Sequence, residues 1–188
     1  MSYKIILASK SPRRKEILEK AGYEIEIRVQ DADETLPESI LPSDAVKMLA
    51  EIKASAVEKN QNELVIGADT VVALDGKILG KPKDENDAFL MLKSLSGRIH
   101  QVYTGVCIIT NKEKVSFAEC SEVIFNELTD EQIKAYINTG EPMDKAGAYG
   151  IQGFASAFAK VFSGSYYNVM GLPIETLNKK ILEIEKSY

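Results

Sequence analysis

Apolar and polar positions change their spacing several times along the chain, and each spacing predicts an element. Short continuous or alternating apolar runs predict strands, whereas apolar positions three and four residues apart predict helices. Because the two kinds of element interleave, the predicted fold class is α/β. Strands are predicted at 4–8, 23–29, 64–74, 77–79, 102–109, 115–125 and 155–162, and helices at 12–21, 43–58, 84–95, from 129 and from 173.

Turn and capping residues support these boundaries. The Asp-Gly pair at 75–76 is a two-residue hairpin signal, so the strands beside it are expected to pair antiparallel. Ser11 and Ser43 are expected to cap helices, and Thr129 opens a capping box. Since hairpins occur together with strand-helix-strand units, we predict a mixed, twisted sheet with flanking helices.

Composition is that of a folded protein in water. The 188 residues, 45% hydrophobic and 27% charged, suffice for one core, and no repeat or linker divides them. We therefore expect a single domain over 1–188. No apolar run is long enough to span a membrane and no signal peptide is recognisable, so we expect a cytoplasmic protein without membrane contact.

Charge and rare residues narrow the chemistry. The formal charge of −5 argues against broad binding to nucleic acid, so an anionic ligand needs a local group of cations. His100 is the single histidine of the sequence, which leaves carboxylates to hold any metal. Cys107 and Cys120 lie in apolar runs and are expected to be buried free thiols.

Three cations lie in the first turn of the helix predicted from residue 12. Arg13, Arg14 and Lys15 stand where the helix dipole disfavours positive charge unless an anion binds there. With the free backbone N–H groups of that turn, they suit phosphate oxygens. The alternative is a solvated basic segment that pairs with neighbouring glutamates.

Two further charges occupy positions expected to be buried. Lys53 falls within an apolar helical stripe, so it must reach solvent, pair with a carboxylate or face an anion. Asp69 is the only charge in 64–74 and is a structural carboxylate, a metal ligand or a general base. Thr70 follows it, and the two side chains could line one site only at a bulge or a strand end.

Loop residues supply weaker candidates. Lys81 follows the predicted hairpin and is either a ligand cation or an exposed lysine. Asp33 and Glu34 could join Asp69 in binding Mg²⁺, although loop carboxylates are more often solvated. Gln152 lies in the glycine-rich segment 147–153, where its amide could read a base edge or simply face solvent.

Together these residues resemble the Maf family of nucleotide pyrophosphatases over nearly the whole chain. Each motif alone is weak, but their occurrence in one order is specific. Asp33 departs from the pattern, because relatives often carry glutamate there, so Glu34 is the safer metal candidate. The matching motifs are LASKSPRR at 7–14, DE at 33–34, EIKA at 51–54, GADT at 67–70, GKP at 80–82, LSGR at 95–98 with His100, MDKAGAYGIQG at 143–153 and VMGLP at 169–173.

The resemblance implies a fold like that of inosine-triphosphate pyrophosphatases, with two lobes around a nucleotide cleft. It also implies a reaction that depends on a divalent cation, Mg²⁺ or Mn²⁺. In this reaction a nucleoside triphosphate and water give the monophosphate and pyrophosphate. Residues that match Arg13, Thr70 and Gln152 mark the members selective for dTTP and UTP, and this chain has all three.

Individual roles follow from the resemblance together with the chemistry of the residues. Asp69 matches the residue regarded as the proton acceptor, and with Glu34 it would hold the metal. Ser9 would donate a hydrogen bond to the substrate, and Gln152 is complementary to the O4 and N3–H edge of uracil or thymine. The cations expected to bind the triphosphate and the departing pyrophosphate are Arg13, Arg14, Lys53 and Lys81, of which the two lysines are assigned to catalysis with Asp69.

Alternatives remain open at this level. The chain could be a nucleotide-binding regulator of septum formation without significant turnover, or a pyrophosphatase for purine or methylated-guanine nucleotides. The expected partner is a nucleoside triphosphate, either a standard or a modified pyrimidine nucleotide. The sequence does not determine the oligomeric state, and a homodimer is one of the states it allows.

Overall fold

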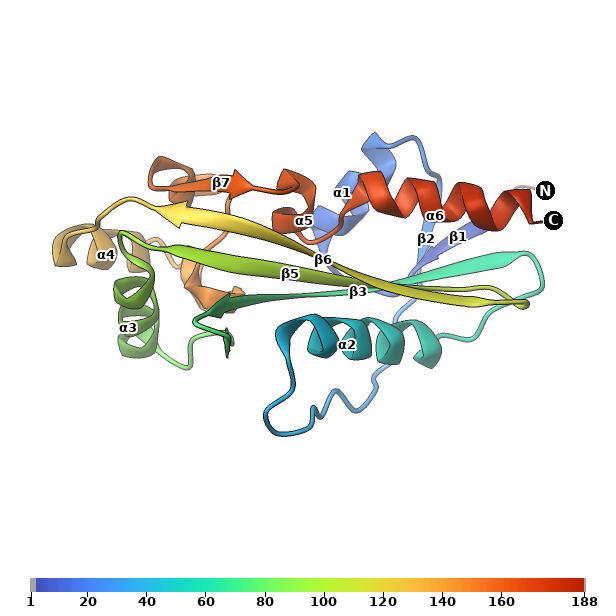
Figure 1. The fold of residues 1–188 in the computed structure, drawn as a ribbon, viewed down its shortest axis with the longest axis horizontal. Coiled ribbons are helices and arrows are strands. Elements are labelled where there is room, and N and C mark those ends of the chain that lie inside the picture. The colour runs from blue at the N-terminus through green and yellow to red at the C-terminus, as the bar shows by residue number, and fades with distance from the viewer. Residues whose placement is uncertain (1–2, 188) are drawn as a thin grey trace. The chain divides into compact units, whose positions relative to one another are not determined.

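The sheet contains both parallel and antiparallel strands, as predicted (Figure 1). The computed structural model describes residues 3–187. Within them the strands are β1 (Lys4–Leu7), β2 (Ile25–Ile27), β3 (Glu63–Leu74), β4 (Lys77–Leu79), β5 (Ile99–Ile109), β6 (Lys114–Phe125) and β7 (Ala159–Ser163). Their order is β2-β1-β3-β5-β6-β7, with β4 paired to β3. β1 is parallel to β2 and β3, whereas β4 is antiparallel to β3 and β7 to β6.

Helices connect and flank these strands, which confirms the α/β class. The capping box at Thr129 is present, and Asp84 caps α3 by accepting a hydrogen bond from the N–H of Asp87 at 2.8 Å. The helices described are α1 (Pro12–Lys20), α2 (Pro42–Ala56), α3 (Glu85–Leu95), α4 (Asp130–Ile137), α5 (Tyr166–Met170) and α6 (Ile174–Lys186), with the 3₁₀ helices η1 (Glu141–Asp144), η2 (Ala146–Ala148) and η3 (Gly153–Ala157).

Two predicted caps differ from the structure. Ser11 occupies the N-cap position of α1, but its side chain makes no capping hydrogen bond. α2 begins at Pro42, so Leu41 is its N-cap residue and Ser43 lies within the first turn. The physical reason is that proline has the φ of a helix and lacks an N–H, which favours it at the first helical position.

Two other predictions are wrong in part. The predicted strand 155–162 begins only at Ala159, because Gly153–Ala157 forms η3. Ala155 of η3 and Ala159 of β7 are both buried and four residues apart, a spacing that fits alternation as well as a helix, so the pattern did not separate the two segments. Cys107 is buried, but Cys120 is exposed, since the pattern of β6 does not say which of its faces is covered.

Contacts divide the chain into two compact units. Unit 1 comprises the residues up to 69, 104–119 and those from 171 onward, and unit 2 comprises 70–103 and 120–170. The single bilobed domain over 1–188 stays a prediction. In unit 1, Figure 1 shows α2 and α6 on opposite sides of the strands. The apolar residues of α6 at 174, 177, 181 and 184 are buried, as its spacing requires.

α2 packs directly against two glycines of the sheet. A Cβ added to Gly67 in β3 would lie 2.2 Å from the backbone oxygen of Ala50, and one added to Gly105 in β5 would lie 2.2 Å from that of Val46. Both distances are far below van der Waals contact, so only glycine allows this approach. The close packing fixes α2 relative to β3 within unit 1.

Three aromatic rings form a buried cluster in unit 2. His100, Phe125 and Tyr149 meet edge to face, with ring centroids 4.8 to 5.3 Å apart. His100 Nε2 lies 2.7 Å from the Tyr149 hydroxyl oxygen. Burial lowers the pKa of His100 to about 4, so the ring is neutral near pH 7. His100 therefore belongs to the core of unit 2.

We expect the stability of the protein to depend on Glu63 at low pH. Arg28 donates hydrogen bonds to both carboxylate oxygens of Glu63, at 2.9 and 3.1 Å, and the N–H of Asn60 donates another. These bonds lower the pKa of Glu63 from 4.5 to about 2, Arg28 having the largest effect. A lowered pKa in the folded state gives stability that is complete above pH 4.5 and is lost as the pH falls towards 2.

Urea unfolding of wild type and Glu63→Gln between pH 7 and pH 3 tests this expectation. The variant should be less stable at pH 7, and the difference should shrink as the pH falls. Glu38→Gln, at an exposed position, is the control for loss of charge alone. A difference that stays constant over this range would contradict the role of the Arg28–Glu63 pair.

Candidate functional site

A lysine lies between two carboxylates in unit 1. Lys53 extends from α2 and forms an ion pair with Asp69 Oδ1 of β3, while its Nζ lies 3.3 Å from Glu34 Oε2. The exposed fractions are 22% for the Lys53 side chain, 17% for Asp69 and 49% for Glu34. Of the three alternatives for Lys53, pairing with a carboxylate is therefore the one observed. All three groups keep some access to solvent and hence to a ligand.

Arg14 and Ser9 join the first helix to the end of β1. Arg14 donates to Ser9 Oγ from Nη1 at 3.1 Å and to the backbone oxygen of Gly171 from Nε at 2.8 Å. Desolvation lowers the pKa of Arg14, while the negative charge of Asp69 acts in the opposite direction. Arg14 is thus electrostatically coupled to Asp69, so the first helix and the central carboxylate of unit 1 belong to one region.

Ser9 is prepared to donate a hydrogen bond. It is buried, and its Oγ accepts from the N–H of Ser11 at 3.2 Å as well as from Arg14. A serine hydroxyl has two acceptor positions and one proton, so with both acceptor positions used the O–H can donate to an anion. This agrees with the donor role that the sequence predicts.

The start of α1 carries positive charge that is only partly compensated, by the ion pair of Lys15 with Glu19 at 3.6 Å. Its first turn contains no acidic residue, and Ser11 supplies no side-chain cap. Arg13 lies there, partly buried, next to Arg14, and its positive charge contributes to the lowered pKa of Arg14. Helix N–H groups and guanidinium groups at one place suit the oxygens of a phosphate chain.

The donor set in unit 1 fits a divalent cation that is completed by substrate. Among residues 3–187 no group of three or more His, Cys, Asp or Glu side chains could hold a metal ion. Glu34 and Asp69 nevertheless both contact one ammonium group, so their oxygens already share a small volume. Mg²⁺ typically takes one or two carboxylates together with waters and substrate phosphates, and two carboxylates match this chemistry.

Thr70 and Lys81 belong to unit 2. β3 continues without interruption through Asp69 and Thr70, so these neighbouring side chains leave opposite faces of the strand. Lys81 is exposed and forms no ion pair within the described part of the chain. Its position is nevertheless defined, because the oxygen of the preceding Gly80 accepts a hydrogen bond from the N–H of Gly147 at 3.0 Å.

Gln152 is exposed on a segment of unusual backbone. Gly147 and Gly153 have φ of 69° and 82°, and a Cβ on Gly147 would lie 2.9 Å from Val72. The Gln152 amide nitrogen donates to Met170 Sδ at 3.4 Å. A thioether is a weak acceptor, so the amide remains available for a stronger partner.

Sequence reasoning missed two residues of these surroundings. The backbone oxygen of Gly171 anchors Arg14, and the sulfur of Met170 contacts Gln152. Both lie in the motif at 169–173, to which no role was assigned. Only the motif in which they lie could have drawn attention to these two residues. A backbone acceptor such as the Gly171 oxygen leaves no other signal in a sequence.

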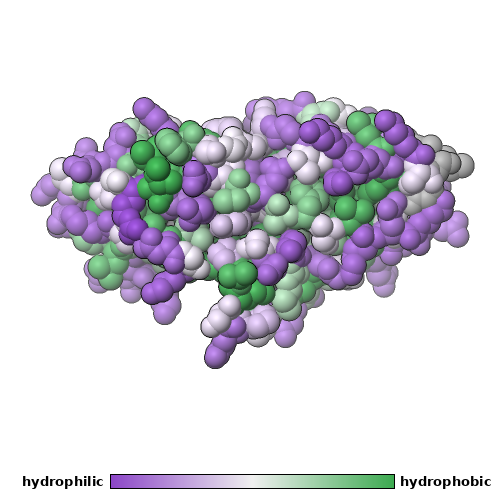
Figure 2. All heavy atoms as spheres, in the orientation of Figure 1, coloured by the Kyte–Doolittle hydropathy of each residue, from purple (hydrophilic) through white to green (hydrophobic). Residues whose placement is uncertain are grey.

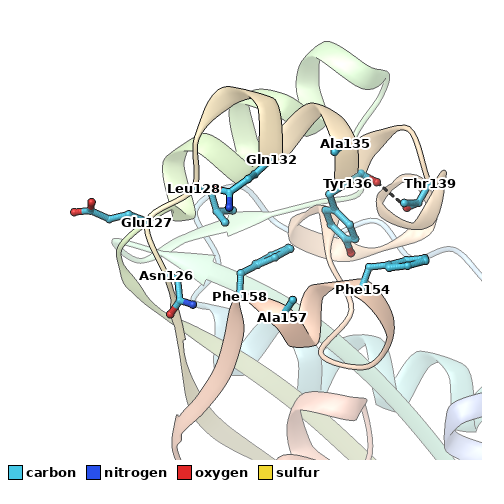
Figure 3. Close-up of a pocket in the computed structure, with 10 residues that line it drawn as sticks. All are labelled: Asn126, Glu127, Leu128, Gln132, Ala135, Tyr136, Thr139, Phe154, Ala157 and Phe158. Atoms are coloured by element: carbon cyan, nitrogen blue, oxygen red, sulfur yellow. Dashed lines mark hydrogen bonds between the residues drawn. The ribbon is translucent and has the colours of Figure 1, made fainter.

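One pocket of unit 2 does not suit a triphosphate. It has a volume of about 480 Å³ and is lined by aromatic, aliphatic and uncharged polar side chains together with one glutamate (Figure 3). No lysine or arginine lines it, so the charge of a phosphate chain would be uncompensated there. Its residues are Asn126, Glu127, Leu128, Gln132, Ala135, Tyr136, Thr139, Phe154, Ala157 and Phe158.

One face of the surface is mostly polar. On the face shown in Figure 2, hydrophilic residues predominate and hydrophobic residues appear in separate patches between them. Within residues 3–187, none of the helices has the length and apolar character needed to cross a membrane.

Comparisons with known proteins agree over nearly the full length. Residues 4–184 match the family model described as Maf-like protein. A dTTP/UTP pyrophosphatase of one Bacillus cereus strain is 54% identical over 179 residues, which cover 95% of this chain and 94% of that protein. A dTTP/UTP pyrophosphatase of Bacillus anthracis is 52% identical over the same length, with the same shares covered.

Solved structures align more loosely. A nucleoside-triphosphatase / dITP/XTP pyrophosphatase from Mycobacterium abscessus aligns with a TM-score of 0.45 at 15% identity, over 98% of this chain and 96% of that one. The Staphylococcus aureus Ham1 protein aligns with a TM-score of 0.47 at 17% identity, over 65% of this chain and 71% of that one.

Proposed function

Because this chain belongs to the Maf-like protein family, we propose that it is a nucleoside triphosphate pyrophosphatase that acts on dTTP and UTP. Relatives more than half identical to it over 95% of its length carry that name. The observation that carries the proposal is the group of cations around one carboxylate in unit 1. Arg14 is coupled to Asp69, and Lys53 is paired with it.

The cations of unit 1 would bind the phosphate chain. Arg13 and Arg14 offer planar guanidinium groups beside the uncapped start of α1, and Ser9 offers its hydroxyl proton. When the substrate arrives, Lys53 can exchange part of its contact with the carboxylates for a phosphate oxygen. Lys81 is proposed as a further cation for the substrate.

The reaction itself is hydrolysis at the α-phosphorus. A water molecule attacks this atom and the bond to the bridging oxygen breaks, so pyrophosphate leaves with the electron pair and the nucleoside monophosphate remains. Asp69 is proposed to orient the water and to accept its proton. Arginine and lysine side chains stabilise the charge on the departing pyrophosphate, and in such reactions positioning and charge compensation supply most of the catalysis.

A divalent cation fits between Glu34 and Asp69. It would be Mg²⁺ or Mn²⁺, and when bound it would neutralise phosphate charge and lower the pKa of a coordinated water. The two carboxylates are within reach of the same lysine ammonium, which keeps them together before any substrate binds. Lys53 thereby prevents the repulsion that two adjacent carboxylates would otherwise cause.

Base recognition is assigned to Gln152, with Arg13 and Thr70 as the other residues that mark selectivity. The Gln152 amide can donate to O4 of uracil or thymine and accept from N3–H. Cytosine presents the reversed pattern, with an amino group at position 4 and an acceptor at position 3. An amide held in one orientation therefore distinguishes the two bases, because the wrong base leaves its polar groups unpaired.

A product analysis in ¹⁸O-labelled water tests the proposal. The protein is incubated with dTTP, UTP, CTP and GTP in the presence of Mg²⁺ or Mn²⁺, and pyrophosphate and orthophosphate are measured separately. We expect pyrophosphate as the first product from dTTP and UTP, with the label in the monophosphate. Orthophosphate as the first product, or label in pyrophosphate, would exclude attack at the α-phosphorus. Tight binding of UTP without any product would instead favour a nucleotide-binding regulator.

A further inference from the structure

Gln152 lies next to a stretch of backbone that one pair of side chains holds. Glu141 accepts a hydrogen bond from the Tyr136 hydroxyl at 2.8 Å and, through its other oxygen, from the N–H of Phe154 at 3.1 Å. Phe154 follows Gln152 by two residues. The carboxylate, itself held by the Tyr136 hydroxyl, therefore restrains the backbone directly after Gln152.

Burial and ring packing hold the Tyr136 side chain of the Tyr136–Glu141 pair in place. Tyr136 is 5% exposed, and its ring meets Phe158 edge to face with centroids 5.2 Å apart. Figure 3 shows Tyr136 pointing from α4 towards the segment that carries Phe154 and Phe158. Burial is the largest cause that raises the pKa of Tyr136, and the Glu141 carboxylate is the next. The hydroxyl therefore stays protonated and donates a hydrogen bond to Glu141.

The carboxylate also fits closely against the backbone beside Gln152. Gly153 has a φ of 82°, and a Cβ added there would lie 2.7 Å from Glu141 Oε2. Only glycine permits both this backbone conformation and this approach. The position of Glu141 is thus matched to the residue that directly follows Gln152, in addition to Phe154.

Few other contacts set the orientation of the Gln152 amide. Its hydrogen-bond partner within residues 3–187 is the Met170 sulfur, a weak acceptor, and the side chain is otherwise exposed. Since the side chain is not enclosed, its direction depends on the backbone from which it extends. The backbone that directly follows Gln152 is held at Phe154 by the Tyr136–Glu141 pair.

We propose that Tyr136 and Glu141 are positioning residues that hold the Gln152 amide in the orientation that selects uracil and thymine over cytosine. This inference rests on the proposed function and deepens it. When the pair is broken, the segment gains freedom and the amide can turn to satisfy the reversed pattern of cytosine. Selectivity should then fall, whereas residues that bind the phosphate chain are unaffected.

Two variants separate this role from general destabilisation. Tyr136→Phe removes only the hydroxyl, and Glu141→Gln keeps the shape of the side chain but loses its charge. We expect the ratio of kcat/KM for UTP to that for CTP to fall about fivefold in Tyr136→Phe, as for a hydrogen bond of about 1 kcal/mol, and tenfold or more in Glu141→Gln. Tyr23→Phe loses a matched hydrogen bond, 3.0 Å to Asn178 in unit 1, and should keep the wild-type ratio.

Two measurements without turnover accompany the kinetics. Hydrogen exchange of the Phe154 amide in the nucleotide-free protein should be faster in both variants than in wild type. The relative affinities of the α,β-methylene analogues of UTP and CTP should change with the kinetic ratio. The inference is overturned if the Phe154 amide exchanges at the wild-type rate, if selectivity is unchanged despite faster exchange, or if Tyr23→Phe lowers selectivity equally.

Failure of the proposed function would be recognised separately. In that case the wild-type protein would release pyrophosphate from none of the triphosphates. The affinities of the two analogues would still decide the inference, because they report base selection without any reaction.

Discussion

Replacement of Asp69 by asparagine is expected to lower kcat for pyrophosphate release by about 10²–10⁴-fold, the range that a general base supplies. The amide cannot accept the proton of the attacking water. Its oxygen can still accept a hydrogen bond from Lys53, so the variant should fold. Because the cations of unit 1 remain, binding of an α,β-methylene analogue of UTP should change little.

Asp75→Asn is the matched control for this substitution. Asp75 lies in the hairpin turn of unit 2 with φ of 52° and pairs with Arg98 at 2.7 Å. Asparagine tolerates this left-handed conformation as well as aspartate does, so the turn should persist. Asp75→Asn should hydrolyse UTP like wild type. If Asp69→Asn also turned over UTP at the wild-type rate, Asp69 could not be the base.

Gly67→Ala is expected to reduce both stability and activity. The new Cβ would lie 2.2 Å from Ala50 O and 2.7 Å from Ala54 N, which are backbone atoms that cannot turn aside. Overpacking of this kind costs about 1–3 kcal/mol, and more where backbone must move. α2 carries Lys53 and β3 carries Asp69, so a shift of the helix also separates this pair.

Gly105→Ala isolates the effect on the site. It produces the same kind of clash with α2, at the backbone oxygen of Val46. Val46 lies about two turns before Lys53 in that helix. Urea unfolding should show both variants destabilised, and kcat with UTP should be measured where each is fully folded. We expect the larger loss of kcat in Gly67→Ala. Wild-type stability of Gly67→Ala would show that α2 and β3 are not in close contact at this position.

Local signals along the chain predicted most of the elements. The hairpin at 75–76 forms with φ of 52° and 77°, as an Asp-Gly turn requires, and the capping box at Thr129 is present. These features depend on residues no more than four apart, so a sequence contains their whole cause. The sequence could not predict that residues 99–101 extend β5, because pairing with a neighbouring strand decides that.

The candidate site was predicted residue by residue, but its contacts were not. For Lys53 the pattern left three alternatives, and the nearest carboxylate partner is 16 residues away in the sequence. For Arg14 the acceptor is a backbone oxygen 157 residues away, which no side-chain pattern can indicate. Thr70 was placed beside Asp69 in the sequence, but the continuous strand turns the two side chains to opposite faces.

By itself the sequence determined the α/β class, most of the helix and strand positions and the family, because periodicity, turn residues and motifs are local properties. Tertiary structure alone decided that Lys53 joins Glu34 to Asp69, that Ser9 keeps a proton to donate, and that Tyr136 and Glu141 hold the backbone directly after Gln152. The reason is that a buried charge or polar group needs a partner, and only the folded chain brings that partner within reach.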